Sequence, residues 1–188
     1  MHNFYPYVGI NLLLNTLPSI FPSDRNSQNF YGENIDMSQI LPTSQHYVVN
    51  SKGEDLIDIA ANLGLNLVRI TNIHRSFEND ADSLYTSEQW NQVLNKMQSK
   101  GIKAVILIEV SSNNGDYYAH DIRPVYLHLV QEYIDSGVFS NPDVYAVDIK
   151  NETVLTDANL KMLQAAHTMI KTKYPDLKQT IGWWATPT

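Results

Sequence analysis

Short apolar runs alternate with amphipathic stretches along this chain, and this alternation constrains the fold more than any other feature. The runs at 65–70, 103–110, 144–149 and 179–184 are nearly continuous in apolar residues. Such runs are typical of strands that are covered on both faces, as in parallel sheets. Because an amphipathic stretch separates each run from the next, right-handed β–α–β crossovers are expected. The sequence therefore predicts an α/β protein with a parallel sheet.

Helix-start signals support the predicted crossovers. Ser51 with Glu54, and Thr86 with Gln89, have the spacing of a capping box, in which the two side chains cap each other's backbone N–H groups. Glycines or a Tyr-Pro pair follow the apolar stripes and mark helix ends. The predicted helices run from Ser51 to Gly64, from near Thr86 to Gly101, over roughly 122–136, and from near Thr156 to the Tyr174-Pro175 break.

The N-terminal part of the chain decides between two α/β architectures, the doubly wound sheet and the closed barrel. A first strand is predicted over 7–14, and the polar stretch from about Asn15 to Asn50 is interpreted as an elaborated loop. No Gly-rich phosphate loop follows this strand, which counts against a nucleotide-binding doubly wound fold. A barrel is therefore favoured, with residues 1–188 forming a single domain.

Composition narrows the function classes. The chain has no cysteine, which excludes disulfides, thiolate zinc sites and cysteine nucleophiles. The formal net charge of -7 predicts no nucleic acid partner, because an acidic surface repels phosphates. The six histidines do not cluster at ligand spacing, so neither a metal nor another cofactor is predicted. No apolar run reaches membrane-spanning length and no signal peptide is visible. The expected location is secreted or periplasmic if a signal peptide was removed, and cytoplasmic otherwise.

Polar side chains gather where the predicted strands end. In barrels, catalytic groups lie at the carboxyl ends of the strands. The candidates there are Asn11, Arg69, Asn151, Glu152 and Trp183. The opposite ends of the strands carry few polar side chains. The sequence therefore predicts one site, at the carboxyl edge of the sheet.

The segment 146–152, Ala-Val-Asp-Ile-Lys-Asn-Glu, resembles the strand-four signature of clan A glycoside hydrolases, and especially of the cellulase-like family 5. Residues 66–70 and 180–183 are similar to the second and fifth strands of that clan. Thr153 replaces a frequent Pro, and Ser111 replaces a frequent His. The resemblance implies a partial (β/α)8 TIM barrel of about five parallel strands and four helices.

The same resemblance implies a retaining hydrolase of β-linked poly- or oligosaccharides. Glu152 would be the general acid/base, Asn151 would bind the sugar 2-hydroxyl, and Arg69 would orient the partner carboxylate. Asn11 and Trp183 are further candidates for substrate contact. A carboxylic acid delivers a proton to a glycosidic oxygen near neutrality when its pKa is raised. Burial next to a second carboxylate can raise it.

The nucleophile of this clan comes from strand seven, and a closed barrel needs about 250 residues. The chain ends just after the fifth predicted strand, so it is expected to be the N-terminal part of a glycosidase barrel and inactive alone. Two alternatives stay open: a non-catalytic carbohydrate-binding partial barrel, and a module whose open strand edges pair with another chain or a second copy. The carbohydrate-binding alternative keeps the Trp and Asn side chains for recognition only. Single residues also have a structural interpretation, with Glu152 as a solvated loop carboxylate and Trp183 as a core residue.

Overall fold

A parallel sheet forms the centre of the computed structural model, which describes residues 9–10, 35–71, 85–108, 123–150 and 156–181. All strand pairs within the sheet are parallel. The main strands follow the order β1-β3-β4-β5-β6, and β2 also pairs with β3. The strands are β1 (Gly9–Ile10), β2 (Ile35–Asp36), β3 (Leu67–Thr71), β4 (Lys103–Leu107), β5 (Val144–Asp148) and β6 (Lys178–Thr180).

The strand order distinguishes the two architectures that the sequence left in competition. A doubly wound sheet reverses its order at a switch point. In the described part of the chain, β3, β4, β5 and β6 instead lie side by side in sequence order, and β1 and β2 both pair with the outer edge of β3, without a reversal. Consecutive parallel strands of this kind are the arrangement found in a β/α barrel. The predicted α/β class with about five consecutive parallel strands is therefore confirmed.

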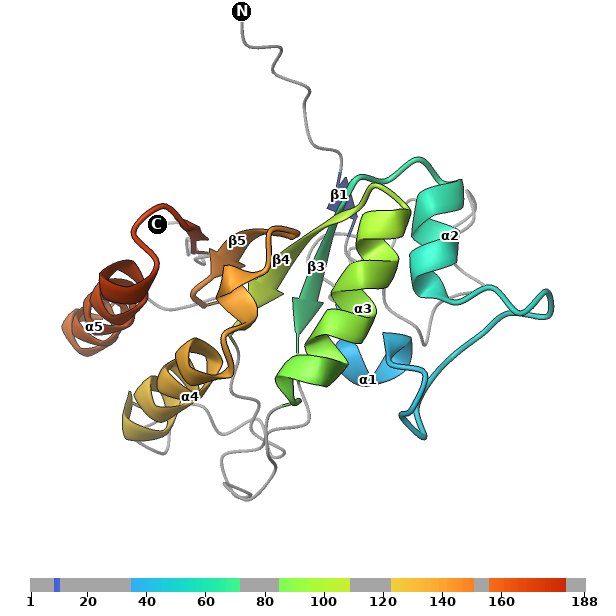
Figure 1. Cartoon of the computed structure of the whole chain (residues 1–188). Helices are drawn as coiled ribbons and strands as arrows, with labels where there is room; N and C mark the ends of the chain where they lie inside the picture. Colours follow the sequence, from blue (N-terminus) through green and yellow to red (C-terminus); the bar gives the residue numbers. More distant parts are fainter. Residues whose placement is uncertain (1–8, 11–34, 72–84, 109–122, 151–155, 182–188) are drawn as a thin grey trace, which may run out of the picture.

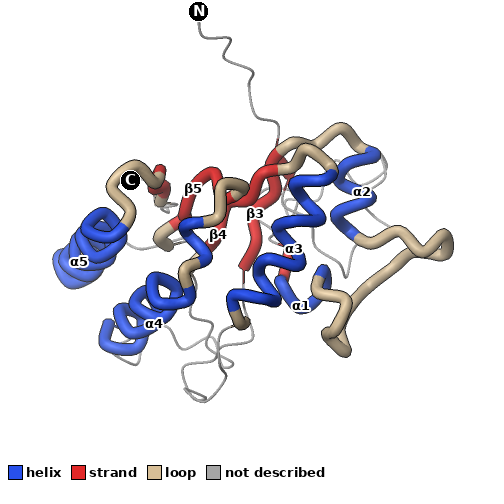
Figure 2. The backbone as a smooth tube through the Cα atoms, viewed as in Figure 1, coloured by secondary structure: helices blue, strands red, loops and turns tan. Residues whose placement is uncertain are grey.

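Helices cover one side of this sheet (Figures 1 and 2). They are α3 (Ser87–Ser99), α4 (Arg123–Ser136), the 3-10 turn η4 (Val138–Ser140) and α5 (Asp157–Lys173). The starts predicted near Thr86 and Thr156 are confirmed, because both residues are N-caps. Thr86 Oγ1 accepts from the Gln89 N–H at 3.2 Å, and Gln89 Oε1 accepts from the Thr86 N–H at 2.8 Å. The capping box predicted from spacing is therefore present.

One short helix, α2 (Leu56–Asn62), stands where a helix was predicted over Ser51–Gly64, and a second, α1 (Met37–Ile40), lies in the predicted loop. The predicted start at Ser51 is wrong. Asn50 Oδ1 accepts from the Lys52 and Glu54 N–H groups at 2.9 and 3.0 Å, so the segment containing Ser51 forms a turn. The N-cap of α2 is Asp55, whose carboxylate accepts from the N–H groups of the following turn at 3.0 and 3.1 Å.

The interpretation of 15–50 as a loop is also wrong in part. Residues 35–40 form β2 and α1, and Ile35, Met37 and Ile40 are all buried. β1 pairs with β3 as far as Val68, and β2 pairs with the same edge at Ile70 and Thr71. The predicted strand 7–14 is confirmed at Gly9–Ile10, and its other residues lie outside the described residues.

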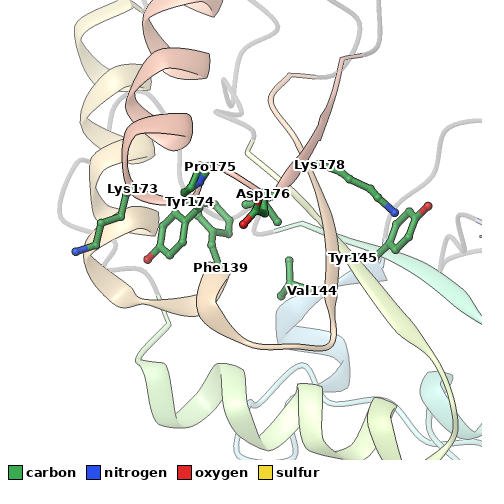
Figure 3. A pocket seen from close by; sticks show the side chains of 9 residues that line it. Phe139, Val144, Tyr145, Lys173, Tyr174, Pro175, Asp176 and Lys178 are labelled. Atoms are coloured by element: carbon green, nitrogen blue, oxygen red, sulfur yellow. The ribbon is translucent and has the colours of Figure 1, made fainter.

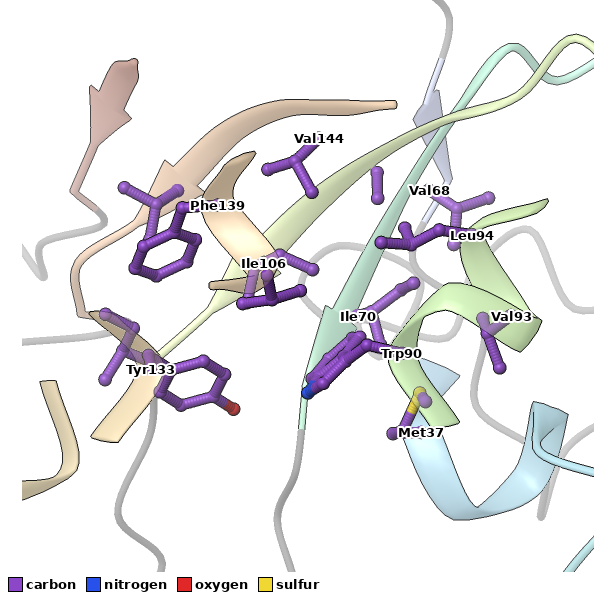
Figure 4. Packing of buried hydrophobic residues seen from close by; sticks show 14 of the residues in the cluster. Met37, Val68, Ile70, Trp90, Val93, Leu94, Ile106, Tyr133, Phe139 and Val144 are labelled. Atoms are coloured by element: carbon purple, nitrogen blue, oxygen red, sulfur yellow. The ribbon is translucent and has the colours of Figure 1, made fainter. Parts of the chain in front are cut away.

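The hydrophobic core lies between the sheet and the helices. Trp90, Tyr133 and Ile106 meet there from α3, α4 and β4 (Figure 4). The Trp90 ring lies 6.2 Å from the Tyr133 ring, and the Tyr133 ring lies 5.8 Å from that of Phe139. Aromatic rings at such distances contribute beyond the area they bury. This core fixes the strands from one side and leaves the other face of the sheet for the site.

An ionic cluster joins α2 to α3. Lys96 Nζ lies 2.7 Å from Oδ2 of both Asp55 and Asp58, and Lys100 Nζ lies 2.8 Å from Asp58 Oδ1. Asp55 is fully buried and also accepts from the Tyr47 hydroxyl at 2.9 Å. The hydrogen bonds from Lys100 and Lys96 hold the pKa of Asp58 far below its usual range. A carboxylate whose pKa is lowered on folding stabilises the protein above its unfolded pKa, and this stabilisation is lost on acidification.

Replacing Asp58 by Asn is therefore expected to make the unfolding free energy less dependent on pH under acidic conditions. The unfolding free energy of the wild type should fall more steeply than that of Asp58→Asn as the pH drops below about 4, the unfolded pKa of Asp. Urea unfolding at a series of pH values measures both slopes. Asp157→Asn removes an exposed first-turn carboxylate from α5 and is the control. Parallel curves for wild type and Asp58→Asn would contradict the expectation.

Candidate functional site

The candidate site begins with the face of the sheet that points away from the helices. Val68 and Ile70 of β3 point into the helix-covered core. Side chains alternate along a strand, so Arg69 between them points to the opposite face, which we call the inner face. The predicted inward orientation of Arg69 follows from this alternation and from the burial of its two neighbours.

Strand register arranges the inner-face residues in two rows. Arg69 is level with Val105, and Val105 is level with Ala146. The row nearer the carboxyl ends consists of Thr71, Leu107, Asp148 and Thr180. Asp148 therefore lies one row closer to the predicted mouth than Arg69, on a strand that is separated from β3 by β4.

Arg69 and Asp148 form an ion pair across this face. Arg69 Nη2 donates a hydrogen bond to Asp148 Oδ2, and the two side chains are 13% and 11% exposed. Neighbouring strands are about 4.8 Å apart, so the two side chains together bridge the roughly 10 Å between β3 and β5. The pair therefore links the second and fourth positions of the sheet and directs the guanidinium group toward the carboxyl ends.

Burial has a measurable effect on the Asp148 carboxyl. It raises the pKa of Asp148 above the usual value, while the charge and hydrogen bond of Arg69 and the charge of Lys150 act in the opposite direction. Lys150 follows shortly after β5 and is itself only 5% exposed. Within the described part of the chain, Asp148 Oδ1 has no hydrogen-bond partner. The ionised form of Asp148 therefore depends on the cations beside it.

The end of β5 is held firmly by its neighbours. The Ile108 N–H donates to the Asp148 carbonyl at 3.0 Å, and the Ile149 N–H donates to the Thr180 carbonyl at 2.9 Å. The Tyr126 hydroxyl of α4 donates to the Ile149 carbonyl. Strands on both sides and a helix thus fix the backbone at the point where the chain leaves the sheet toward residue 151.

Of the predicted site residues, the structure describes Arg69. Asn11, Asn151, Glu152 and Trp183 lie outside the described residues. The pairing of Asp148 with Arg69 was not predicted. The signal that was available is its alternation with Lys150, which places both on one face of an extended segment.

Asp36 also lies at this edge, and sequence analysis did not include it. It is level with Thr71 and is buried, and its carboxylate caps α1 by accepting from the Ser38 N–H at 2.8 Å. Burial and the charge of Asp36 raise the pKa of Tyr85 to about 12. Asp36 ends β2 at the carboxyl edge of the sheet, and Tyr85 directly precedes the N-cap of α3. Their contacts give them a structural role.

A pocket of about 350 Å³ lies at the opposite end of the sheet, where β5 and β6 begin. It is lined by Phe139, Tyr145, Tyr174 and Lys178, among others (Figure 3). Lys178 Nζ lies 3.8 Å from the centre of the Tyr145 ring. The amino ends of barrel strands serve stability rather than catalysis. This pocket is therefore separate from the predicted site.

Among the described residues, no group of three or more His, Cys, Asp or Glu side chains is arranged to hold a metal ion. The described helices include none that is long and apolar enough to cross a membrane.

Comparison with known proteins supports the fold. No protein-family model and no curated protein matches the sequence. Among solved structures, the endoglucanase Cel5A of Pseudomonas stutzeri is similar with a TM-score of 0.55 and 19% identity, over 91% of this chain and 49% of that chain. A family 1 b-glucosidase from Thermotoga maritima gives 0.45 with 17% identity, over 66% and 35% of the two chains. Endo-glycoceramidase II from Rhodococcus sp. gives 0.46 with 16% identity, over 79% and 47%.

We base the comparison on the endoglucanase, which has the highest TM-score of the three. At this sequence identity the similarity concerns the fold alone. The chain spans about half the length of the endoglucanase. It therefore has an α/β fold of parallel strands and helices that matches about half of a TIM-barrel glycosidase.

Proposed function

We propose that the protein to which this chain belongs is a retaining glycoside hydrolase that acts on β-linked poly- or oligosaccharides. The observation that carries the proposal is the buried ion pair of Arg69 and Asp148 on the inner face, near the carboxyl ends of parallel strands. Active sites of β/α barrels lie at this end. The sequence similarity of 146–152 to a clan A strand supplies the chemical class.

In this proposal Glu152 is the general acid/base. Ala146 and Asp148 belong to the inner-face rows, and Lys150 and Glu152 continue the same alternation in the sequence. An extended continuation of β5 would therefore give Glu152 the face that carries Arg69. The nearly dry environment of Asp148 supports a raised pKa for an acid placed close by.

The other predicted residues bind substrate in this proposal. Asn151 hydrogen-bonds the sugar 2-hydroxyl, while Asn11 and Trp183 contact the sugar rings. Arg69 keeps the partner carboxylate charged and oriented. A retaining mechanism requires that this second carboxylate lie about 5–5.5 Å from the acid/base. This chain spans about half of the similar endoglucanase. In this proposal the second carboxylate therefore lies outside the 188 residues.

The proposal is tested with the whole protein that contains this chain, on aryl β-glycosides and on soluble β-linked polysaccharides. Time-resolved proton NMR of the first sugar released reports the anomer, and the β-anomer is expected because retention keeps the configuration. An α-anomer as first product would contradict retention. If calorimetry detects glycan binding and no sugar is released, the assignment changes from an enzyme to a carbohydrate-binding protein.

A further inference from the structure

We propose that Asp148 is a positioning residue, which holds the Arg69 guanidinium group at the carboxyl edge of the inner face. This inference rests on the proposed function, because its effect is measured in turnover. Asp148 itself is assigned no contact with the sugar. It acts through Arg69, to which it is joined by a direct hydrogen bond between Oδ2 and Nη2.

The register shows why Arg69 needs such an anchor. Its Cα lies in the lower of the two inner-face rows, level with Val105 and Ala146. An Arg side chain has several rotamers, and the hydrogen bond to Asp148 favours those that extend across the inner face. Asp148 lies one row higher and two strands away. Binding to it extends the side chain toward the mouth and across β4.

Burial strengthens the contact between Arg69 and Asp148. The two side chains are 13% and 11% exposed, so water competes little for either partner. Removal of one partner from a buried pair leaves an uncompensated charge. Because Arg69 stays protonated, a loss of the Asp148 charge would weaken the contact without neutralising the guanidinium group. The Asp148 charge therefore contributes to the position of this group.

The same two strands, β4 and β5, provide a matched comparison at their other end. Lys103 begins β4, and its Nζ lies 2.6 Å from Oδ1 of Asp143, which directly precedes β5. The Asp143 side chain is 3% exposed, so it is at least as buried as Asp148. It lies at the amino ends, away from the proposed chemistry. Asp143→Asn thus removes a buried ionic carboxylate without touching the proposed site.

The experiment is a double-mutant cycle in the whole protein, with Asp148→Asn, Arg69→Lys and the combination. A misplacement of about 1 Å in a positioning group can reduce turnover by about 10²-fold. Asp148→Asn is expected to lower kcat by this order with little change in KM. The double variant should be no slower than the slower single variant, because both changes disrupt one unit. Asp143→Asn should keep kcat within about two-fold of the wild type, since its effect is on stability.

Two results would overturn the inference while leaving the glycosidase in place. One is an equal loss of kcat in Asp148→Asn and Asp143→Asn, and the other is additive losses in the double variant. A wild type that releases no sugar would remove the proposed function, and the inference with it. If Asp148→Asn does not fold, Asp148→Glu keeps the charge but displaces it by one methylene. That variant should have the same urea midpoint of unfolding as the wild type but a lower turnover. Full activity in Asp148→Glu would equally overturn the inference.

Discussion

Replacing Glu152 by Gln is expected to lower kcat on polysaccharide by about 10²–10⁴-fold, the usual contribution of a general acid/base. A glutamine has nearly the same shape but cannot donate the proton that a sugar leaving group needs. The loss of kcat/KM should shrink on aryl glycosides whose leaving phenol is acidic, because kcat/KM reports the step in which the leaving group departs, and an acidic phenol departs without protonation. Initial rates on a series of aryl β-glycosides of graded phenol pKa measure this dependence.

Glu88→Gln is the matched control for this substitution. Glu88 lies exposed in the first turn of α3, within the helix layer. Its replacement should leave turnover on every substrate of the series within experimental error. Wild-type turnover in Glu152→Gln would remove Glu152 from the mechanism. A uniform loss of kcat/KM across all leaving groups would show that Glu152 does not act as the proton donor.

Replacing Trp90 by Ala is expected to lower the unfolding free energy by about 3–5 kcal/mol, the range for buried aromatic residues. Trp90 is fully buried, and its ring lies 6.4 Å from that of Tyr85 and 6.2 Å from that of Tyr133. Its loss would open a cavity between α3, α4 and the sheet. Equilibrium urea unfolding, followed by far-UV circular dichroism, measures the change.

Two further variants define the cause of this loss. Trp90 Nε1 is buried without a hydrogen-bond partner among the described residues. Trp90→Phe keeps most of the ring and removes that donor, so it should be clearly less destabilising than Trp90→Ala. Leu160→Ala changes an apolar side chain of α5 that is 41% exposed, and should cost less than about 1 kcal/mol. Equal losses in Leu160→Ala and Trp90→Ala would contradict the assigned role of the core.

The parts of the fold that were predictable from sequence depend on local signals. The capping box of Thr86 and Gln89 lies within one turn, and the stripe with Trp90 repeats at helical spacing. Continuous apolar runs identified β4 and β5 without knowledge of their neighbours. The class, the parallel sheet and the main helices could therefore be predicted before any tertiary contact was known.

The first third of the described fold was harder to predict, because tertiary contacts determine it. Ile35 and Met37 lie in a stretch rich in Asn and Ser, where a two-residue strand has no periodicity to detect. Both are buried, and this burial compensates for weak local propensity. Asp55 rather than Ser51 starts α2 because a buried carboxylate accepts from Lys96 and Tyr47 as well as from the helix.

Of the residues in the predicted site the structure describes Arg69, and its pairing partner was not predicted. Alternation along β3 is a local signal for the face on which Arg69 lies. Its pairing with Asp148 depends on an irregularity between Ala104 and Val105, where the register of β4 against β5 shifts. A shift of one residue exchanges the faces of a strand. No sequence periodicity reports such a shift, so the partner of Arg69 could not be identified in advance.

The shared edge of β3 has a consequence for how this half-barrel assembles. β1 and β2 lie along the same edge, yet β2 is much closer in sequence to β3 and is followed by its own helix. Short loops close at lower entropic cost than long ones, so the contact of β2 with β3 is expected to form before that of β1. In a chain that starts shortly before Ile35, β2 is still expected to pair with Ile70 and Thr71. The backbone amides in the carboxyl half of β3 should then stay protected from hydrogen exchange with solvent.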